Sequence, residues 1–243
     1  MEVVPTLDDV QALRQLTLAH EHLVICLCGV DVEQDTDTFV LQASLQKIIR
    51  IKMQMNGDHC MSLAKVQESK LVIEQEFTRD VGALVVAVPR IFSSTDHDST
   101  VDLDALLSDA ICYFGAQQDM ETASSFRLLL IYRQVKQTPQ LHVIHREIPN
   151  RFIDDPACHL DVIYWHHDVP FTAAQCVFDQ LCSYDNTNPL AKFYFLEVGE
   201  SVERLHQALV LVLSHPAHRL SQNGAEQLLE SRFSPSKRVN SLN

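Results

Sequence analysis

The sequence predicts a three-layer α/β domain, in which helices cover both faces of a mostly parallel sheet with one antiparallel edge strand. Short apolar runs typical of strands buried on both faces alternate with amphipathic helical stretches along the chain. Two further strands are joined so closely that they must form an antiparallel hairpin, because a parallel crossover needs about a dozen residues. The 243 residues, 46% of them apolar, are enough for one sizeable core.

The first predicted strand organises the rest of the chain. Residues 23–28 (LVICLC) are all apolar, and Gly29 and an acidic stretch follow them. An apolar stripe with the helical period then predicts a helix that starts at Asp35 or Asp37 and runs to about Met55. Loops after the carboxyl ends of parallel strands are the usual place for a site in such sheets.

The middle of the chain contains the hairpin. Residues 59–66 and 70–77 are predicted as its strands. Residues 79–88 could form a helix or a strand, and Pro89 is expected to end it. A clear helix is predicted at residues 102–114, after a polar loop.

Three more strands are predicted in the second half: a buried one at residues 128–132 and two others at 160–165 and 193–198. Residues 141–148 are ambiguous. Thr172 and Ser201 are expected to cap two helices, the second ending at His215-Pro216. The predicted organisation is an N-terminal arm or short helix (1–19), one domain (20–215), and a C-terminal segment with a flexible tail (216–243).

Composition excludes several classes of function. The formal net charge of −13 argues against nucleic-acid and anionic-membrane binding. No apolar run approaches the length of a membrane span, and the N-terminal residues lack the basic region and long apolar core of a signal peptide. The seven cysteines lack disulfide spacing, and those in apolar runs (Cys26, Cys28, Cys112, Cys176) are expected to be buried thiols. We therefore expect a soluble intracellular protein.

Motifs for catalysis or cofactors are missing. The six glycines are too far apart for a dinucleotide or phosphate loop. His20-Glu21-His22 resembles the H-x-H of JAMM metalloproteases, but the serine and aspartate positions of that motif fall on Val30 and Glu33. The motifs H-E-x-x-H, G-x-S-x-G and paired C-x-x-C are also missing. The sequence therefore predicts neither catalytic residues nor a cofactor.

Two polar stretches at strand ends leave alternatives open. The acidic loop after the first strand could hold Mg²⁺, or it could supply helix-capping carboxylates in solvent. His166-His167-Asp168 follows another strand, but neighbouring residues of an extended chain point in opposite directions, which disfavours a shared metal. The acidic loop contains four carboxylates: Asp31, Glu33, Asp35 and Asp37.

The segment after the last helix, residues 214–222 (SHPAHRLSQ), is a candidate for partner binding. Proline orders such a segment in advance, and arginine offers a forked donor to a partner carboxylate. The alternative is an ordinary helix end with a proline stop.

Several of these pieces together resemble one family, the von Willebrand A-like scaffold subunit of the BRISC and BRCA-A deubiquitinase assemblies. The resemblance covers roughly residues 20–222. It rests on the strand at 23–28, a helix start, two further strands and, most specifically, a His-Pro-x-x-Arg exit. Beyond the first strand, its motifs are Phe77–Asp80, Leu128–Tyr132, Leu160–His166 and Leu213–Arg219.

The resemblance implies a non-catalytic scaffold with a von Willebrand A-like (Rossmann-like) fold. Such a subunit binds the ubiquitin-E2-variant-like subunit BRE and works beside an Abraxas-type scaffold and a catalytic JAMM metalloprotease. The resemblance implies work in the cytoplasm and nucleus, in ubiquitin signalling and DNA-damage repair. It also implies that the exit segment binds the partner, through His215, Pro216, His218, Arg219 and Gln222.

The chain departs from the family pattern in two places. The metal-binding signature D-x-S-x-S after the first strand lacks its two hydroxyl residues, and Leu220 stands where proline is expected after the arginine. The scaffold is our main hypothesis. The alternative is a metal-dependent hydrolase or adhesion module that uses Asp31, Glu33 and His166.

Overall fold

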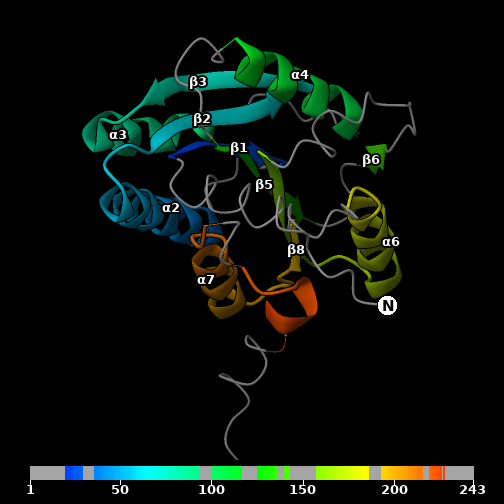
Figure 1. Cartoon of the computed structure of the whole chain (residues 1–243). Coiled ribbons are helices and arrows are strands. Elements are labelled where there is room, and N and C mark those ends of the chain that lie inside the picture. The colour runs from blue at the N-terminus through cyan, green and yellow to red at the C-terminus, as the bar shows by residue number, and fades with distance from the viewer. Residues whose placement is uncertain are drawn as a thin grey trace, which may run out of the picture.

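The computed structural model describes most of the region predicted to fold (Figure 1). The described residues are 20–29, 36–92, 100–116, 125–135, 140–142, 157–185, 193–215, 219–225 and 227. The predicted N-terminal arm, the acidic positions 31, 33 and 35, and residues 228–243 of the tail lie outside them.

A six-stranded sheet forms the centre of the molecule, with the strand order β3-β2-β1-β5-β7-β8. Strand β1 pairs in parallel with β2 and β5, β7 pairs in parallel with β5 and β8, and β2 pairs with β3 antiparallel. The predicted mostly parallel sheet with one antiparallel edge strand is therefore confirmed. Its strands are β1 (Glu21–Cys28), β2 (Cys60–Gln67), β3 (Lys70–Thr78), β5 (Ser125–Val135), β7 (Cys158–His167) and β8 (Tyr194–Glu197).

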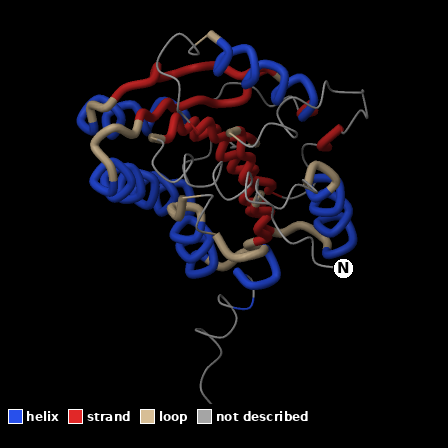
Figure 2. Tube along the Cα trace, viewed as in Figure 1, coloured by secondary structure: helices blue, strands red, loops and turns tan. Residues whose placement is uncertain are grey.

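Helices cover both faces of the sheet, as Figure 2 shows in blue around the red strands. Alternate residues of β1 point to opposite cores: Leu23, Ile25 and Leu27 to one, Val24, Cys26 and Cys28 to the other. The first core lies under α2 (Thr36–Met55), α3 (Val81–Ile91) and α7 (Val202–Leu211). The second lies under α4 (Leu103–Gly115) and α6 (Phe171–Cys182). The three-layer prediction is thus confirmed.

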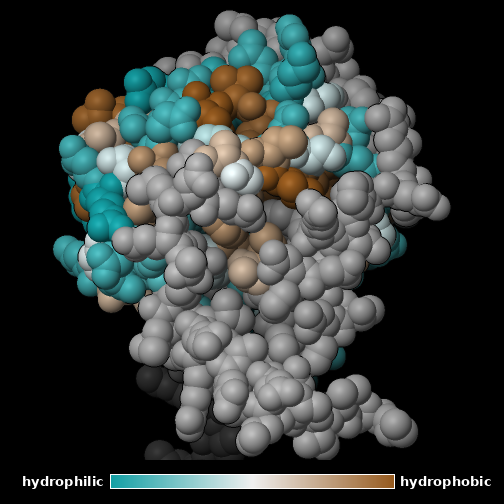
Figure 3. Space-filling view, turned by 45° about the horizontal axis from the view of Figure 1, so that its top comes forward, coloured by the Kyte–Doolittle hydropathy of each residue, from teal (hydrophilic) through white to brown (hydrophobic). Residues whose placement is uncertain are grey.

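The hairpin β2–β3 turns through two residues in the left-handed region, Glu68 (φ 49°) and Ser69 (φ 58°). Consecutive positive φ values are typical of the tight turns that match the twist of a hairpin. Strand β3 is an edge strand, half-buried along most of its length. Figure 3 shows apolar brown surface among teal on the side of the molecule that carries β3 and α4.

Helix α3 settles the ambiguous segment 79–88 as a helix and corrects the predicted role of Pro89. Asp80 caps the helix, and its Oδ1 accepts hydrogen bonds from the backbone N–H groups of Gly82 (2.8 Å) and Ala83 (3.1 Å). Pro89 lies inside the helix, which continues to Ile91. Proline removes one backbone donor, and in the last turn the following residues still keep helical geometry.

The start of α6 corrects the prediction for Thr172. The helix begins at Phe171 with Pro170 as its N-cap, so Thr172 lies in the first turn. The carbonyl of Pro170 accepts the N–H groups of Ala173 and Ala174 (both 2.9 Å). Ser201 does cap α7, since its Oγ accepts from the N–H of Arg204 at 3.2 Å. This helix ends at Leu211, four residues before the predicted stop.

A second, two-stranded parallel sheet was not predicted. It joins β4 (Thr100–Asp102) to β6 (Gln140–His142), three residues each. Strands this short leave little periodicity in a sequence. The prediction of buried thiols was half right, because Cys26 and Cys28 are buried whereas Cys112 and Cys176 are exposed.

Candidate functional site

The amino-terminal edge of the main sheet carries a buried cluster of charges. Parallel strands begin at the same edge, so early residues of β1, β5 and β7 meet there. These residues are Glu21, Arg127 and Asp161, and none of the three side chains is exposed. Arg127 Nε donates to Asp161 Oδ2 at 2.5 Å, and Arg127 Nη1 lies 3.7 Å from Glu21 Oε2. Buried charges persist only when they are paired.

The cations of this cluster also bind the end of α7. Arg127 Nη2 donates to the carbonyl of Val212, and Lys52, which is ion-paired with Glu21, donates to the carbonyl of Leu213 at 3.2 Å. The last carbonyls of a helix lack intrahelical donors and carry partial negative charge. The cluster therefore fixes the point at which the chain leaves α7.

A second arginine reaches the cluster from the C-terminal strap, our name for residues 219–225. Arg219 binds Asp161 with both ends of its fork, at 2.5 Å (Nη1–Oδ1) and 2.7 Å (Nη2–Oδ2). Its guanidinium also stacks 4.5 Å from the ring centre of Tyr194. The fork that was predicted to bind a partner's carboxylate is occupied by a carboxylate of this chain, and Arg219 is only 4% exposed.

The pKa values show that the charges support one another. Burial alone would raise the pKa of Asp161, but Arg127 and Arg219 lower it to about 2. Burial would likewise raise the pKa of Glu21, and Arg127 and Lys52 hold it below its ordinary value. Burial lowers the pKa of Lys52 to about 8 against the attraction of Glu21. The two carboxylates are therefore ionised at neutral pH.

The edge strand β8 holds the remainder of the strap. In Figure 1 the strap is the orange-red segment beside α7. The side-chain amide of Gln222 accepts from the N–H of Phe195 (3.0 Å) and donates to its carbonyl (2.8 Å). Tyr194 donates its hydroxyl to the carbonyl of Leu220 at 3.0 Å. The chain stays packed through Ala225, which is fully buried in the core.

The other predicted partner-binding residues divide between described and undescribed positions. His215 Nε2 lies 3.9 Å from Glu21 Oε1, at the margin of the cluster. Pro216 and His218 lie outside the described residues. The structure thus brings His215, Arg219 and Gln222 to the same end of the sheet, where β1, β7 and β8 begin.

At the carboxyl-terminal edge of the sheet, the side chains of the two neighbouring histidines at the end of β7 point to opposite faces. His166 Nε2 lies 2.9 Å from Glu197 Oε1 and its ring packs on Tyr164. His167 lies on the other face, with Nδ1 3.9 Å from Asp37 Oδ2. The argument from strand geometry is thus confirmed.

His167 forms a loose group with Asp168 and Glu200, whose possible ligand atoms lie within 4.8 Å of one another. All three are partly or fully exposed. His166, the predicted metal ligand, does not belong to this group, and Asp31 and Glu33 lie outside the described residues. The residues after β1 do not fit the metal signature of von Willebrand A domains, because its hydroxyls are missing.

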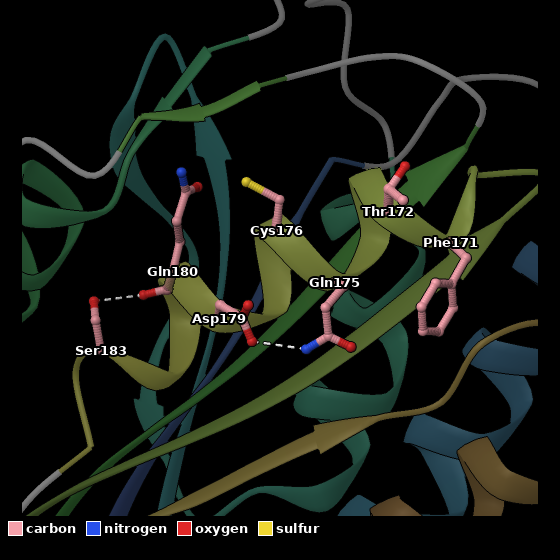
Figure 4. Close-up of a pocket in the computed structure, with 7 residues that line it drawn as sticks. All are labelled: Phe171, Thr172, Gln175, Cys176, Asp179, Gln180 and Ser183. Carbon is pink, nitrogen blue, oxygen red and sulfur yellow. Dashed lines mark hydrogen bonds between the residues drawn. The ribbon is translucent and has the colours of Figure 1, made fainter.

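A shallow cavity of about 570 Å³ lies along the outer side of α6. Figure 4 shows that its lining comes from this helix and the residue after it, with Gln175 bonded to Asp179 and Ser183 bonded to the carbonyl of Gln180. The lining side chains are mostly polar, with Phe171 78% exposed. Because its lining comes from one helix and the residue after it, it resembles an ordinary helix surface more than the concave cleft of a ligand pocket.

Sequence reasoning missed Arg127 and Asp161, which hold the strap in place. A signal was available for Asp161, a charged residue within the predicted and otherwise apolar strand 160–165, whereas Arg127 lies one residue before the predicted strand 128–132. Such charges need a partner of opposite sign. The pattern along the chain does not reveal that the two pair with each other and with Arg219.

Comparison with solved structures identifies the fold. The SpRpn10 VWA domain matches with a TM-score of 0.55 and 13% identity, over 84% of this chain and 98% of that domain. VWA2, the ArnB paralog of Sulfolobus acidocaldarius, matches with a TM-score of 0.46 and 10% identity, over 82% of this chain and 46% of that one. A von Willebrand factor type A protein from Catenulispora acidiphila matches with a TM-score of 0.45 and 10% identity, over 82% of this chain and 43% of that one.

The chain therefore has the von Willebrand A-like fold that the resemblance implied. Searches with family models and against curated proteins found no match. Within the described residues, none of the helices is both long and apolar enough to cross a membrane.

Proposed function

We propose that this chain is a non-catalytic scaffold subunit that binds a BRE-type subunit and supports a linkage-specific deubiquitinase assembly of the BRISC or BRCA-A type. The observation that carries the proposal is the fixed exit of the chain from α7. The most specific motif of the resemblance, Leu213–Arg219, is held at its described ends, the carbonyl of Leu213 by Lys52 and Arg219 by Asp161. Residues that are held in place in advance lose less entropy when a partner binds them.

In this proposal the catalytic member of the assembly is a JAMM metalloprotease, and an Abraxas-type scaffold is a further subunit. The chain works in the cytoplasm and nucleus, in ubiquitin signalling and the DNA-damage response. The absence of an active site of its own belongs to the same proposal. It is supported by the cluster at the amino-terminal edge, because Glu21 and Asp161 are sealed from solvent and paired, which is a structural role.

The test is a binding titration of the whole chain with a purified BRE-type subunit. We expect saturable binding that Arg219→Ala weakens. Arg204→Ala, an exposed arginine on α7, is the matched control and should bind like the wild type. A wild-type chain that does not bind the subunit contradicts the proposal.

A second candidate is the metal-dependent hydrolase or adhesion module that uses Asp31, Glu33 and His166. The group of His167, Asp168 and Glu200 beside His166 is the observation in its favour, since imidazole and carboxylate ligands suit divalent cations. Calorimetric titration with Mg²⁺, Mn²⁺ and Zn²⁺ tests it. Binding that is lost on Asp31→Ala supports this candidate, and the absence of binding heat for all three ions contradicts it.

A further inference from the structure

The C-terminal strap is anchored on both sides of one exposed apolar residue, Leu220. Before it, Arg219 is bound to Asp161 through two hydrogen bonds. After it, Gln222 binds both backbone groups of Phe195, in the manner of a neighbouring strand. The backbone carbonyl of Leu220 itself accepts the hydroxyl of Tyr194.

Between these anchors the side chain of Leu220 is 51% exposed. A single exposed leucine is common on protein surfaces. Here, however, the backbone around it is fixed, so the side chain is presented in one place.

The anchoring residues are poorly placed to contact a partner themselves. Arg219 is buried, and drawing its guanidinium out to a partner would leave Asp161 short of a counter-charge in the interior. Breaking a buried pair in this way is strongly unfavourable. If Gln222 turned to a partner, the backbone N–H and carbonyl of Phe195 would lose the hydrogen bonds that they make with its side-chain amide.

We infer that Arg219 and Gln222 are positioning residues, and that Leu220 is the side chain that enters an apolar pocket of the partner subunit. The inference rests on the proposed function and specifies which residue of the segment the partner reads. Leucine at this position is also the departure from the proline expected by the resemblance, so the partner's pocket must accept a branched aliphatic side chain.

The contact is tested by measuring the affinity of the whole chain for the purified BRE-type subunit, together with thermal melting. Leu220→Ser should weaken binding about tenfold or more, because a buried leucine is lost from the interface, and should leave the melting temperature unchanged. Val86→Ser is the control, since Val86 is 75% exposed on α3. Wild-type binding by Leu220→Ser overturns the inference, whereas no binding by the wild type overturns the proposed function instead.

A double-mutant cycle tests the positioning role of Arg219. If Arg219 acts only through Asp161, then Arg219→Gln should add no further loss of affinity in the Asp161→Asn background. A further loss there would show direct contact with the partner and would contradict the inference. Should the Asp161 variant fail to fold, Gln222→Ala provides the second anchor variant: it should weaken binding less than Leu220→Ser, and the opposite order would contradict the inference.

Discussion

Asp161 connects three separate parts of the chain through one carboxylate. It accepts hydrogen bonds from Arg127 on β5 and Arg219 on the strap, and its Oδ1 accepts the N–H of Tyr194 at 3.2 Å. Every lone pair of a buried carboxylate that finds a donor lowers the cost of burying the charge. The residue therefore stabilises the sheet and the strap at once.

Replacing Asp161 by Asn should destabilise the fold strongly. The variant leaves Arg127 and Arg219 without their shared counter-charge, and loss of one partner of a buried ion pair costs about 3–5 kcal/mol. Urea denaturation measures this as a lower free energy of unfolding. Asp168→Asn, at a carboxylate with 61% of its side chain exposed, is the control and should change little. Equal stability of the two variants would show that the cluster is not structural.

Gly29 is the second residue with a sharp expected effect. Its φ is +73°, and an added Cβ would lie 2.2 Å from the carbonyl oxygen of Arg133. Backbone strain alone costs about 1–3 kcal/mol. Gly29→Ala should therefore lower the free energy of unfolding by at least this amount. Gly57→Ala meets no atom within 4 Å and should be neutral or slightly stabilising in the same denaturation measurement. Similar effects of the two substitutions would contradict the close approach of β5.

At the level of single residues, the sequence was informative about chemistry and silent about partners. Arg219 was selected from its motif, and it does bind a carboxylate with a fork. That carboxylate, Asp161, lies 58 residues away in the chain. Local pattern carries no record of such a pairing, because it depends on how β7 and the strap meet in space.

Among the elements, α3 shows that a proline in the last turn does not end a helix. Two backbone N–H groups of its first turn are satisfied by Asp80, and its buried residues lie on one face. Propensity left this segment open between helix and strand because almost all its residues are apolar. Tertiary packing against the sheet decides in favour of the helix.

Asp80→Ala should cost about 0.5–2 kcal/mol of stability, because the cap oxygen that serves Gly82 and Ala83 is removed. Asp80→Asn keeps an acceptor oxygen in the same place and should retain most of that stability. Urea denaturation of both variants beside the wild type measures the difference. If Asn proves as damaging as Ala, the negative charge and not the hydrogen bond is what matters at this position.

For the whole molecule, the sequence predicted the architecture well because a parallel sheet buried on both faces leaves long apolar runs. The hairpin was found from the short connection between its strands. The β4–β6 sheet was missed because three-residue strands carry almost no pattern. The strap was missed as a packed element because its anchors are two polar side chains, Arg219 and Gln222, and polar residues in a tail indicate exposure when read alone.

Two buried histidines should make the stability of the fold sensitive to acid. Burial lowers the pKa of His59 to about 4 and of His159 to about 3, below the ordinary value of 6.5. Below about pH 6.5 the unfolded chain binds protons that the folded chain does not, so the free energy of unfolding falls as the pH drops. Asp161, with a pKa of about 2, adds a further loss below about pH 4.

Urea denaturation over a series of pH values measures this dependence. In His59→Asn one titrating ring is removed, while the asparagine oxygen can still accept the N–H of Glu21 that His59 Nδ1 accepts at 3.0 Å. The variant should lose stability less steeply between about pH 6.5 and 4 than the wild type. Stability that does not change with pH in this range would contradict the assignment of neutral buried histidines.

The central claim is that this chain acts as a binding subunit through the segment that leaves α7 and ends in the strap. Hydrogen–deuterium exchange of the whole chain, with and without the purified BRE-type subunit, tests it most directly. The account predicts that the partner slows exchange in peptides covering residues 213–225, with little change at the carboxyl-terminal edge around His167 and Asp168. Slower exchange confined to that edge, or no change anywhere, would contradict it.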